Sequence, residues 1–294
     1  MFGEKIDIHI LRLISHDRNI KTEEELEAEI ELFNHNATEE DFKKFTGRSG
    51  QYFDWHGKKI LDVCCGKGDL VRSLAKNGAK EVLGVDIQHK HIEIAKKISE
   101  KENIQNVKFI ESDFHKFYTD ARFDYVISYE AFDHIHDMRG TLKKMANLLK
   151  NNGEMVNFAA GFWGSPSADH CDNFMRIFIP WRHLIFNEKA LFKIRQEKFR
   201  PTDLGTNFES IRGGLSKYTF TDYKKAIHEL EDFEIVTFEC NYQFKYIFNG
   251  LFYPLYLISQ FVSRIPLLKE LFIYSSFTVL KKTADVALDD KYLI

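Results

Sequence analysis

The most informative segment of the chain is ILDVCCGKGDL, residues 60–70. Its apolar start predicts a buried strand, its glycines predict a tight turn, and its last residues predict the start of a helix. Such a turn brings backbone N–H groups close to a ligand, because small residues permit the approach. The segment is not a dinucleotide-binding fingerprint, because Val71 occupies the position of the third glycine of that motif. It is not a phosphate-binding loop either, because it lacks the sequence Gly-Lys-[Ser/Thr]. Asp62 would repel a pyrophosphate and suits a cationic, amino-acid-like ligand.

Outward from this segment, strands and helices alternate along residues 58–160. Strands are expected at 58–65, 81–87, 106–112, 123–130 and 154–160, and helices at 68–78, 89–103 and 138–153. A helix at 222–231 and strands at 233–240 and 275–282 resume the pattern later. Strict alternation calls for an α/β fold with a mostly parallel sheet covered by helices on both faces.

Breaks in this alternation divide the chain into four regions. Residues 1–57 are expected to form a helical N-terminal cover, and residues 58–160 the ligand-binding core. Residues 161–218, with nine basic and six acidic residues, are expected to be a substrate-recognition insertion. Residues 219–294 complete the sheet and include an apolar insertion at 245–273.

Composition excludes several classes of protein. The 294 residues carry a net charge of −3, which argues against nucleic-acid binding through a basic surface. The four cysteines make no disulfide framework and no zinc spacing, so a reducing, cytoplasmic location is expected. The first 17 residues contain acids and histidines and do not resemble a signal peptide.

The turn at residues 62–68 resembles the first motif of the class I S-adenosylmethionine-dependent methyltransferases, an acidic residue followed by x-Gly-x-Gly-x-Gly. Asp62, Cys64, Gly66 and Gly68 align with this motif, with Cys64 in place of the first glycine. Cys65 stands where the family often has cysteine. The resemblance implies a Rossmann-like, seven-stranded sheet and S-adenosylmethionine as the cofactor.

Further matches follow at the later strand ends. Asp86, followed by Ile87, aligns with the family's acid that bonds the ribose hydroxyls, and Asp113-Phe114 with the pair that holds adenine. The family's segment after the fourth strand, which often contains Glu-His, aligns with residues 128–137, SYEAFDHIHD. The cofactor contacts implied by the resemblance are Asp62, Cys64, Cys65, Gly66, Gly68, Asp86, Ile87, Asp113, Phe114 and Glu130.

Methyl transfer from a sulfonium requires mainly that the nucleophile be positioned and, for an O–H or ammonium group, deprotonated. The expected catalytic residues are Tyr129 and His134, after the fourth strand, and His170 from the insertion. His183 is a weaker candidate, which could instead brace a turn. The run DHIHD, residues 133–137, invites a metal interpretation, but no third separated ligand cluster is evident. No metal is therefore expected, and activity should survive chelation.

The acceptor is expected to be a small-molecule or lipid-linked hydroxyl, amine or carboxyl compound. Parts of 161–218 and the chain's end resemble a group of uncharacterised microbial methyltransferases, which names no acceptor. The aromatic stretch 245–273 predicts an apolar wall or a peripheral membrane contact, with internal packing or dimerisation as alternatives. Its uncharged run 246–263 is interrupted by Pro254 and Gln260, so a membrane-spanning helix is not expected.

Two other classes of function stay open at this point. The first is a catalytically silent methyltransferase-like binding protein, because a cofactor site does not prove turnover. The second is a scaffold associated with a membrane surface, which rests on residues 245–273 alone.

Overall fold

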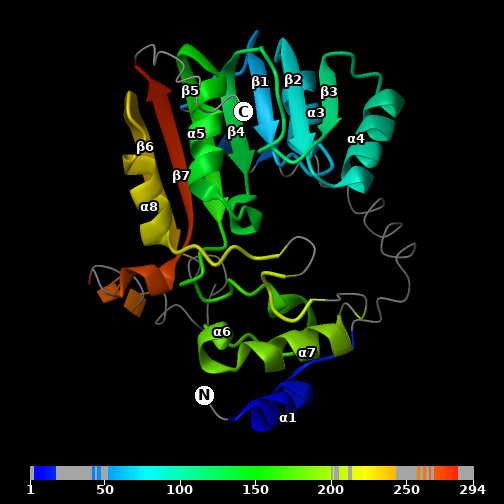
Figure 1. Ribbon diagram of the computed structural model, residues 1–294, viewed down its shortest axis with the longest axis vertical. Helices are drawn as coiled ribbons and strands as arrows, with labels where there is room; N and C mark the ends of the chain where they lie inside the picture. Colours follow the sequence, from blue (N-terminus) through cyan, green and yellow to red (C-terminus); the bar gives the residue numbers. More distant parts are fainter. Residues whose placement is uncertain are drawn as a thin grey trace.

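The fold is drawn in Figure 1 from a computed structural model of the chain. The residues that the structure describes are 3–17, 42–43, 45–47, 52–199, 201, 205–210, 214–242, 257–258, 261–262, 265 and 268–283. Residues 18–41 of the helical cover expected at 1–57, and most of the uncharged run 246–263, lie outside the described residues.

A single seven-stranded sheet organises the molecule, in the strand order β3-β2-β1-β4-β5-β7-β6. The strands are β1 Lys59–Val63, β2 Glu81–Asp86, β3 Val107–Glu111, β4 Phe123–Tyr129, β5 Leu149–Ala160, β6 Phe233–Tyr242 and β7 Ile273–Lys282. The pairs β3-β2, β2-β1, β1-β4 and β4-β5 are parallel, and β7 runs antiparallel to both β5 and β6. The expected α/β class and mostly parallel sheet are confirmed.

Helices lie on both faces of this sheet and beyond one of its edges. They are α1 Glu4–Ile14, α3 Asp69–Lys76, α4 His89–Lys101, α5 Met138–Leu148, α6 Arg182–Ile185, α7 Glu188–Lys198 and α8 Phe220–His228. Short 3-10 turns are η1 Phe132–His134, η2 Cys171–Phe174 and η3 Lys269–Phe272. The helix expected at 138–153 ends at Leu148, because β5 begins at Leu149 and already includes Asn151 and Asn152.

Each face of the sheet has its own apolar core. On one face α5 and α8 bury Leu142, Met145 and Tyr223 against the strands. On the other face α3 and α4 bury Leu74 and Ile92. Strands covered on both faces are mostly apolar, which explains the buried run from Ile60 to Val63 in β1, with Asp62 as its one polar residue.

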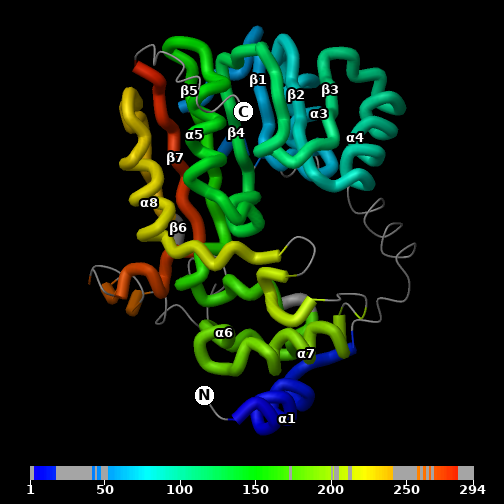
Figure 2. Tube along the Cα trace, viewed as in Figure 1, coloured from blue at the N-terminus to red at the C-terminus, as the bar shows by residue number. Residues whose placement is uncertain are grey.

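A separate helical layer lies beyond the carboxyl ends of the parallel strands. In Figure 1 the arrowheads of β1, β2 and β4 point toward this layer, which contains α1, α6 and α7, and Figure 2 shows its chain path. We call α1 together with residues 161–199 the cap. Its own buried cluster includes Leu11 of α1, Phe174 of η2 and Leu191 of α7. The chain thus places a small core opposite the strand ends where ligands of open α/β sheets bind.

A buried ion pair stabilises the inside of the cap. Arg182 and Asp169 are both fully buried, with 2.6 Å between Arg182 Nη2 and Asp169 Oδ1 and 2.8 Å between Nε and Oδ2. Such a bidentate pair tolerates burial only where the geometry is good, so it fixes the path of residues 169–182. None of the helices in the described part of the chain has the length and apolar character of a membrane span.

Candidate functional site: the carboxyl edge of the sheet

The turn after β1 holds its two glycines for different reasons. Both have positive φ, +54° at Gly66 and +74° at Gly68. A Cβ on Gly66 would meet nothing within 4 Å, so the turn leaves open space there. A Cβ on Gly68 would lie 2.4 Å from Phe109 Cε1, so this glycine permits packing of α3 on the sheet. Gly66 is therefore available to a ligand, whereas Gly68 serves the core.

Asp86 ends β2 beside this turn and holds it in place. Its Oδ2 accepts a hydrogen bond from Gly66 N–H at 2.9 Å, and its Oδ1 accepts one from Gln88 N–H at 2.8 Å. Burial raises the pKa of Asp86, but the His91 imidazole and these two N–H groups outweigh burial, so the pKa lies below its ordinary value. A charged carboxylate with lone pairs to spare can also accept the two hydroxyls of a ribose. Ile87, next in sequence, is 65% exposed at the same edge.

Asp62, in β1, is the least satisfied polar group of the turn. The residue is 2% exposed, and its Oδ1 has no hydrogen-bond partner among the described residues. Burial raises the pKa of Asp62 well above its ordinary range, and the neighbouring charge of Asp86 adds to this. A buried carboxyl without a partner is costly, and a cationic ligand would remove the cost.

The two cysteines of the turn act as small apolar groups. Burial, with the charges of Asp86, Asp62 and Asp113, raises the pKa of Cys64 to about 12. Burial likewise raises the pKa of Cys65, whose sulfur would meet a Cβ on Gly84 at 2.7 Å. Both thiols stay protonated at neutral pH, which makes them poor nucleophiles.

The loop after β3 presents Asp113 and buries its neighbour. Asp113 is half-buried, and its Oδ1 accepts a hydrogen bond from His115 N–H at 2.9 Å. Phe114 is 6% exposed, and its ring stacks on Phe117 with 6.2 Å between centroids. The Phe114 ring is part of the core, so the carboxylate of Asp113 is the group that this loop offers to a ligand.

At the end of β4 the backbone turns sharply. Glu130 is exposed with φ +53°, and its N–H donates to Phe158 O at 2.8 Å. The Tyr129 ring packs between Phe45, at 5.5 Å between centroids, and Phe158, at 5.1 Å. Tyr129 is thus held by aromatic neighbours and anchors Phe45 to the sheet.

The structure brings two of the expected catalytic residues together with Asp133. His170 Nε2 lies 3.0 Å from Asp133 Oδ2, and His134 Nε2 lies 3.7 Å from the same oxygen. The two imidazole rings are 5.5 Å apart between centroids. We call Asp133, His134 and His170 the His–Asp cluster; it supplies, in His170, the third group that the sequence interpretation lacked.

His183 has a structural role in the cap. It is 8% exposed, and its Nε2 donates to the backbone oxygen of Trp163 at 2.6 Å. Burial lowers the pKa of His183, so the imidazole is neutral at physiological pH. It braces the backbone at Trp163.

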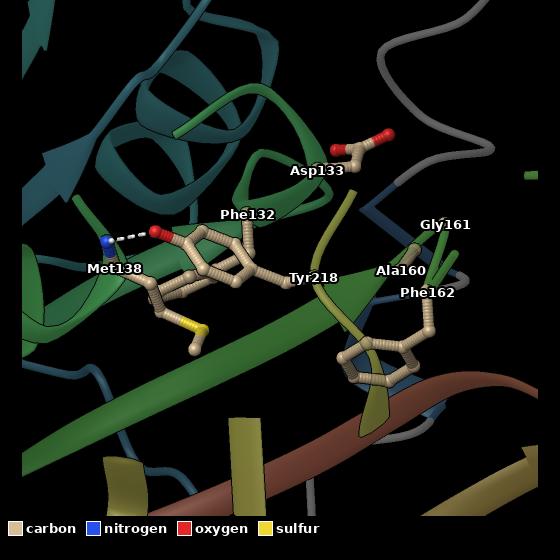
Figure 3. Close-up of a pocket in the computed structure, with 7 residues that line it drawn as sticks. All are labelled: Phe132, Asp133, Met138, Ala160, Gly161, Phe162 and Tyr218. Carbon is tan, nitrogen blue, oxygen red and sulfur yellow. Dashed lines mark hydrogen bonds between the residues drawn. The ribbon is translucent and has the colours of Figure 1, made fainter. Parts of the chain in front are cut away.

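A small pocket beside the His–Asp cluster lies between the sheet and the cap (Figure 3). Its lining is apolar apart from Asp133 and the hydroxyl of Tyr218, and consists of Phe132, Asp133, Met138, Ala160, Gly161, Phe162 and Tyr218. The Tyr218 hydroxyl contacts Met138 N at 3.5 Å and donates to His136 O.

Sequence reasoning missed Gly161 and Tyr218. Gly161 has φ +71°, and a Cβ there would lie 2.7 Å from Asp133 Oδ2. A glycine directly after a buried strand was the available signal for Gly161. Tyr218 carried no such signal, because it reaches the pocket from a segment 80 residues later than Met138.

Comparisons with known proteins agree with this geometry. Residues 55–165 match the family model of the methyltransferase domain. A ubiquinone biosynthesis O-methyltransferase of Coxiella burnetii (strain Dugway 5J108-111) is 33% identical over 126 residues, which are 40% of this chain and 53% of the relative. One of Acinetobacter baumannii (strain ACICU) is 32% identical over 101 residues, 34% of this chain and 42% of the relative. The chain spans about half the length of the curated relatives it matches.

Solved structures share the fold. A putative S-adenosylmethionine-dependent methyltransferase from Listeria monocytogenes superimposes with a TM-score of 0.51 at 16% identity, covering 84% of this chain and 98% of the other. The PH0226 protein from Pyrococcus horikoshii OT3 superimposes with a TM-score of 0.51 at 17% identity, covering 83% of this chain and 90% of the other. Residues 55–165 of this chain therefore match a methyltransferase domain, and the sheet and helices around them have the fold of these solved structures.

Proposed function

We propose that the protein transfers a methyl group from S-adenosylmethionine to a small-molecule acceptor at the carboxyl edge of the sheet. The observation that carries the proposal is Asp62, a buried carboxyl with an orphaned oxygen beside the open space at Gly66. This arrangement fits a ligand with a cationic amino-acid end. Asp86, one strand away, is the charged acceptor for the ribose hydroxyls.

When bound, the cofactor supplies a methyl group already activated by a positively charged sulfur. The chain then has to hold that group and bring the acceptor to it. Asp62 would hold the cationic end, Asp86 would accept the ribose hydroxyls, and Asp113 would accept from the adenine amino group. None of these residues takes part in bond-making, and their contribution to the rate is the positioning of the reacting atoms.

The acceptor side of the site is the His–Asp cluster and the adjoining pocket. A hydroxyl acceptor must lose its proton as its oxygen forms the new bond to the methyl carbon, while the electron pair of the broken S–CH₃ bond stays on sulfur. His170 and His134 are the groups placed to handle that proton, and both contact Asp133. Phe132, Met138 and Phe162 give the small pocket apolar walls, which would favour an apolar group at the edge of the acceptor.

A lipid-linked acceptor is the finer part of the proposal. The matched relatives are named as O-methyltransferases of ubiquinone biosynthesis, which favours a hydroxyl on a partly apolar molecule. Exposed apolar side chains of the 245–273 stretch, Leu257, Ile258 and Phe261, would face a lipid tail or a membrane surface. The +3 charge of 161–218 would suit an anionic group on the same molecule.

Product analysis with a methyl-labelled donor tests the proposal. The purified protein is incubated with labelled S-adenosylmethionine and two acceptor sets, hydroxylated aromatic compounds with and without an isoprenoid tail. Label transferred to an extractable product supports the function, and preference for the tailed set supports the lipid-linked acceptor. Tight cofactor binding without transfer to any hydroxyl, amine or carboxyl compound would instead indicate a catalytically silent binding protein.

Liposome co-sedimentation tests the membrane contact separately. Wild-type protein should sediment with anionic vesicles, and Phe261→Asp should reduce the bound fraction, because it places a charge on the exposed apolar surface. Tyr118→Asp is the matched control, since Tyr118 is 69% exposed and lies far from residues 257–261 in the sequence. Equal sedimentation of both variants would remove residues 257–261 from a membrane role.

A further inference from the structure

We propose that the His–Asp cluster binds one divalent transition-metal cation, with Zn²⁺ as the preferred ion, which polarises the acceptor hydroxyl. The inference rests on the proposed function for the role of the ion but not for its binding. It concerns three side chains, Asp133 and His134 from the β4–α5 connection and His170 from the cap, whose ligating atoms all lie within 4.8 Å of one another.

The distances fit a shared ion. Zinc bonds of about 2.0–2.2 Å to nitrogen and oxygen place tetrahedral ligand atoms about 3.4 Å apart. The two distances from Asp133 Oδ2, 3.0 Å to His170 Nε2 and 3.7 Å to His134 Nε2, lie on either side of that value. Two imidazoles and one carboxylate form a donor set that zinc and related transition metals favour over magnesium or calcium.

The tautomer of His134 also supports a metal-ligand role for this residue. Its Nδ1 lies 3.3 Å from the backbone oxygen of Gly214, and a carbonyl oxygen can only accept, so Nδ1 carries the hydrogen. Nε2 is then the ring nitrogen left to ligate an ion, and it lies 3.7 Å from Asp133 Oδ2. A metal-binding histidine commonly donates its other N–H to a backbone carbonyl, and Gly214 provides that support.

One carboxylate oxygen of Asp133 has no partner among the described residues. The side chain is 8% exposed, and the oxygen without a hydrogen-bond partner is Oδ1. In the described part of the chain its ion pairs are to the two histidines, neither of which has a fixed positive charge. Buried charges are usually paired or bound to metals, so the cation would satisfy this group. Gly161 leaves space beside Asp133 Oδ2 for the ion, because a Cβ at this position would lie 2.7 Å from that oxygen.

Three protein ligands leave a coordination position for the acceptor. The ligand count matches that of catalytic zinc sites, in which the remaining position holds water or substrate. An acceptor hydroxyl bound there would have a lowered pKa and would release its proton to solvent, so with the ion bound His134 and His170 act as its ligands and no longer as the general base. Its oxygen then attacks the methyl carbon, the S–CH₃ bond breaks, and the bond's electron pair stays on sulfur. No oxidant or reductant is needed.

Calorimetry on protein without a histidine tag tests the site directly. Protein stripped with a chelator and dialysed is titrated with Zn²⁺, and Co²⁺ is then added to a second sample as a coloured substitute. We expect one ion per chain, and a weakening of at least about tenfold in each of Asp133→Asn, His134→Ala and His170→Asn. Asparagine is chosen at position 170 because it tolerates the φ of +53° there.

His136→Ala is the matched control, because His136 belongs to the same DHIHD run but not to the cluster. It should bind Zn²⁺ as wild type does. Binding of S-adenosylhomocysteine by every variant, together with its melting temperature, reports whether it is folded. A visible Co²⁺ spectrum in wild type that is lost in His170→Asn would support the assignment.

Two outcomes overturn the metal site while leaving methyl transfer intact. One is a wild-type protein that binds S-adenosylhomocysteine but no Zn²⁺, Co²⁺ or Mn²⁺. The other is Zn²⁺ binding that His134→Ala and His170→Asn leave unchanged, which would place the ion elsewhere. Zinc binding with the expected variant pattern but no cofactor binding would instead retain the metal site and reject the proposed function.

Discussion

The proposed cofactor side and the proposed acceptor side of this molecule are built in different ways. Asp62, Gly66 and Asp86 lie within 25 residues of one another, and adjacent parallel strands bring them together. Asp133 and His170 come from separate layers, and the cap must fold before they meet. The first arrangement depends on local turn geometry and the second on packing between layers. Substitutions should therefore separate cofactor affinity from acceptor chemistry.

The same substitution at the two glycines of the turn should give the largest and most divergent effects. Gly68→Ala should cost about 3 kcal/mol or more of stability, because its Cβ overlaps Phe109 and its φ is positive. Gly66→Ala should cost about 1 kcal/mol of stability, because its φ is positive. It should also weaken the binding of S-adenosylhomocysteine at least about tenfold, because the new Cβ enters the open space. Thermal unfolding and calorimetry check both. A Gly66→Ala protein with wild-type affinity would show that the open space is not the cofactor's.

Leu11→Ala tests whether the cap is energetically separate from the cofactor side. Leu11 is fully buried in the cap, so its truncation should cost about 2–5 kcal/mol of local stability. Hydrogen exchange should rise in α1 and α7 and turnover should fall, while S-adenosylhomocysteine affinity stays unchanged. Leu13→Ala, in the same helix but 65% exposed, is the control. A parallel loss of cofactor affinity would mean that the two sides fold as one unit.

Asp62→Asn should stabilise the protein while weakening its function. The folded-state pKa of Asp62 lies above its unfolded value, so stability falls as pH rises through the window between the two. Removing the ionisable group should raise the free energy of unfolding at pH 8 by about 1–2 kcal/mol, and by less at pH 5. Melting temperatures at the two pH values measure this difference.

The same variant tests the cationic ligand. Affinity of the wild type for S-adenosylmethionine should rise with pH, because the ionised carboxylate binds the cation better, and Asp62→Asn should flatten that dependence. A melting temperature lowered at pH 8, or an unchanged pH profile of binding, would show that Asp62 does not face the cationic end of the cofactor.

Cys64→Gly should give the smallest effect. Cys64 has φ +60°, where glycine is unstrained, so the variant should be about 0.5–1 kcal/mol more stable. Wild-type Cys64 should also resist alkylation at pH 8, because its pKa is about 12. Rapid modification of Cys64, or destabilisation by glycine, would show that the thiol has a function beyond packing.

The two sides also differ in how far the sequence predicts them. Local sequence patterns predict the strands of the sheet, because a buried strand and a glycine turn each have a short-range signature. The same patterns predict the positions of Asp62, Gly66 and Asp86. The structure adds that Gly68 serves packing, which depends on Phe109, 41 positions later.

The acceptor side has no such short-range signature. The pairing of His170 with Asp133 spans 37 positions and depends on the buried Asp169–Arg182 pair that shapes the cap. The boundary between α5 and β5 was misplaced for a related reason, because pairing with β4 extends the strand back to Leu149. Tertiary contacts, which no local pattern contains, decide both features.

Binding of S-adenosylmethionine at the carboxyl edge of β1 and β2 underlies the methyl transfer proposed for this site, and one calorimetric series can decide it. Wild-type protein should bind S-adenosylhomocysteine with one site per chain, and Asp86→Ala should weaken it by about 1–3 kcal/mol through loss of the ribose acceptor. Glu81→Ala, at the opposite end of the same strand, should bind as wild type does. Unchanged affinity in folded Asp86→Ala, or no binding by the wild type, would show that the cofactor does not bind at this edge.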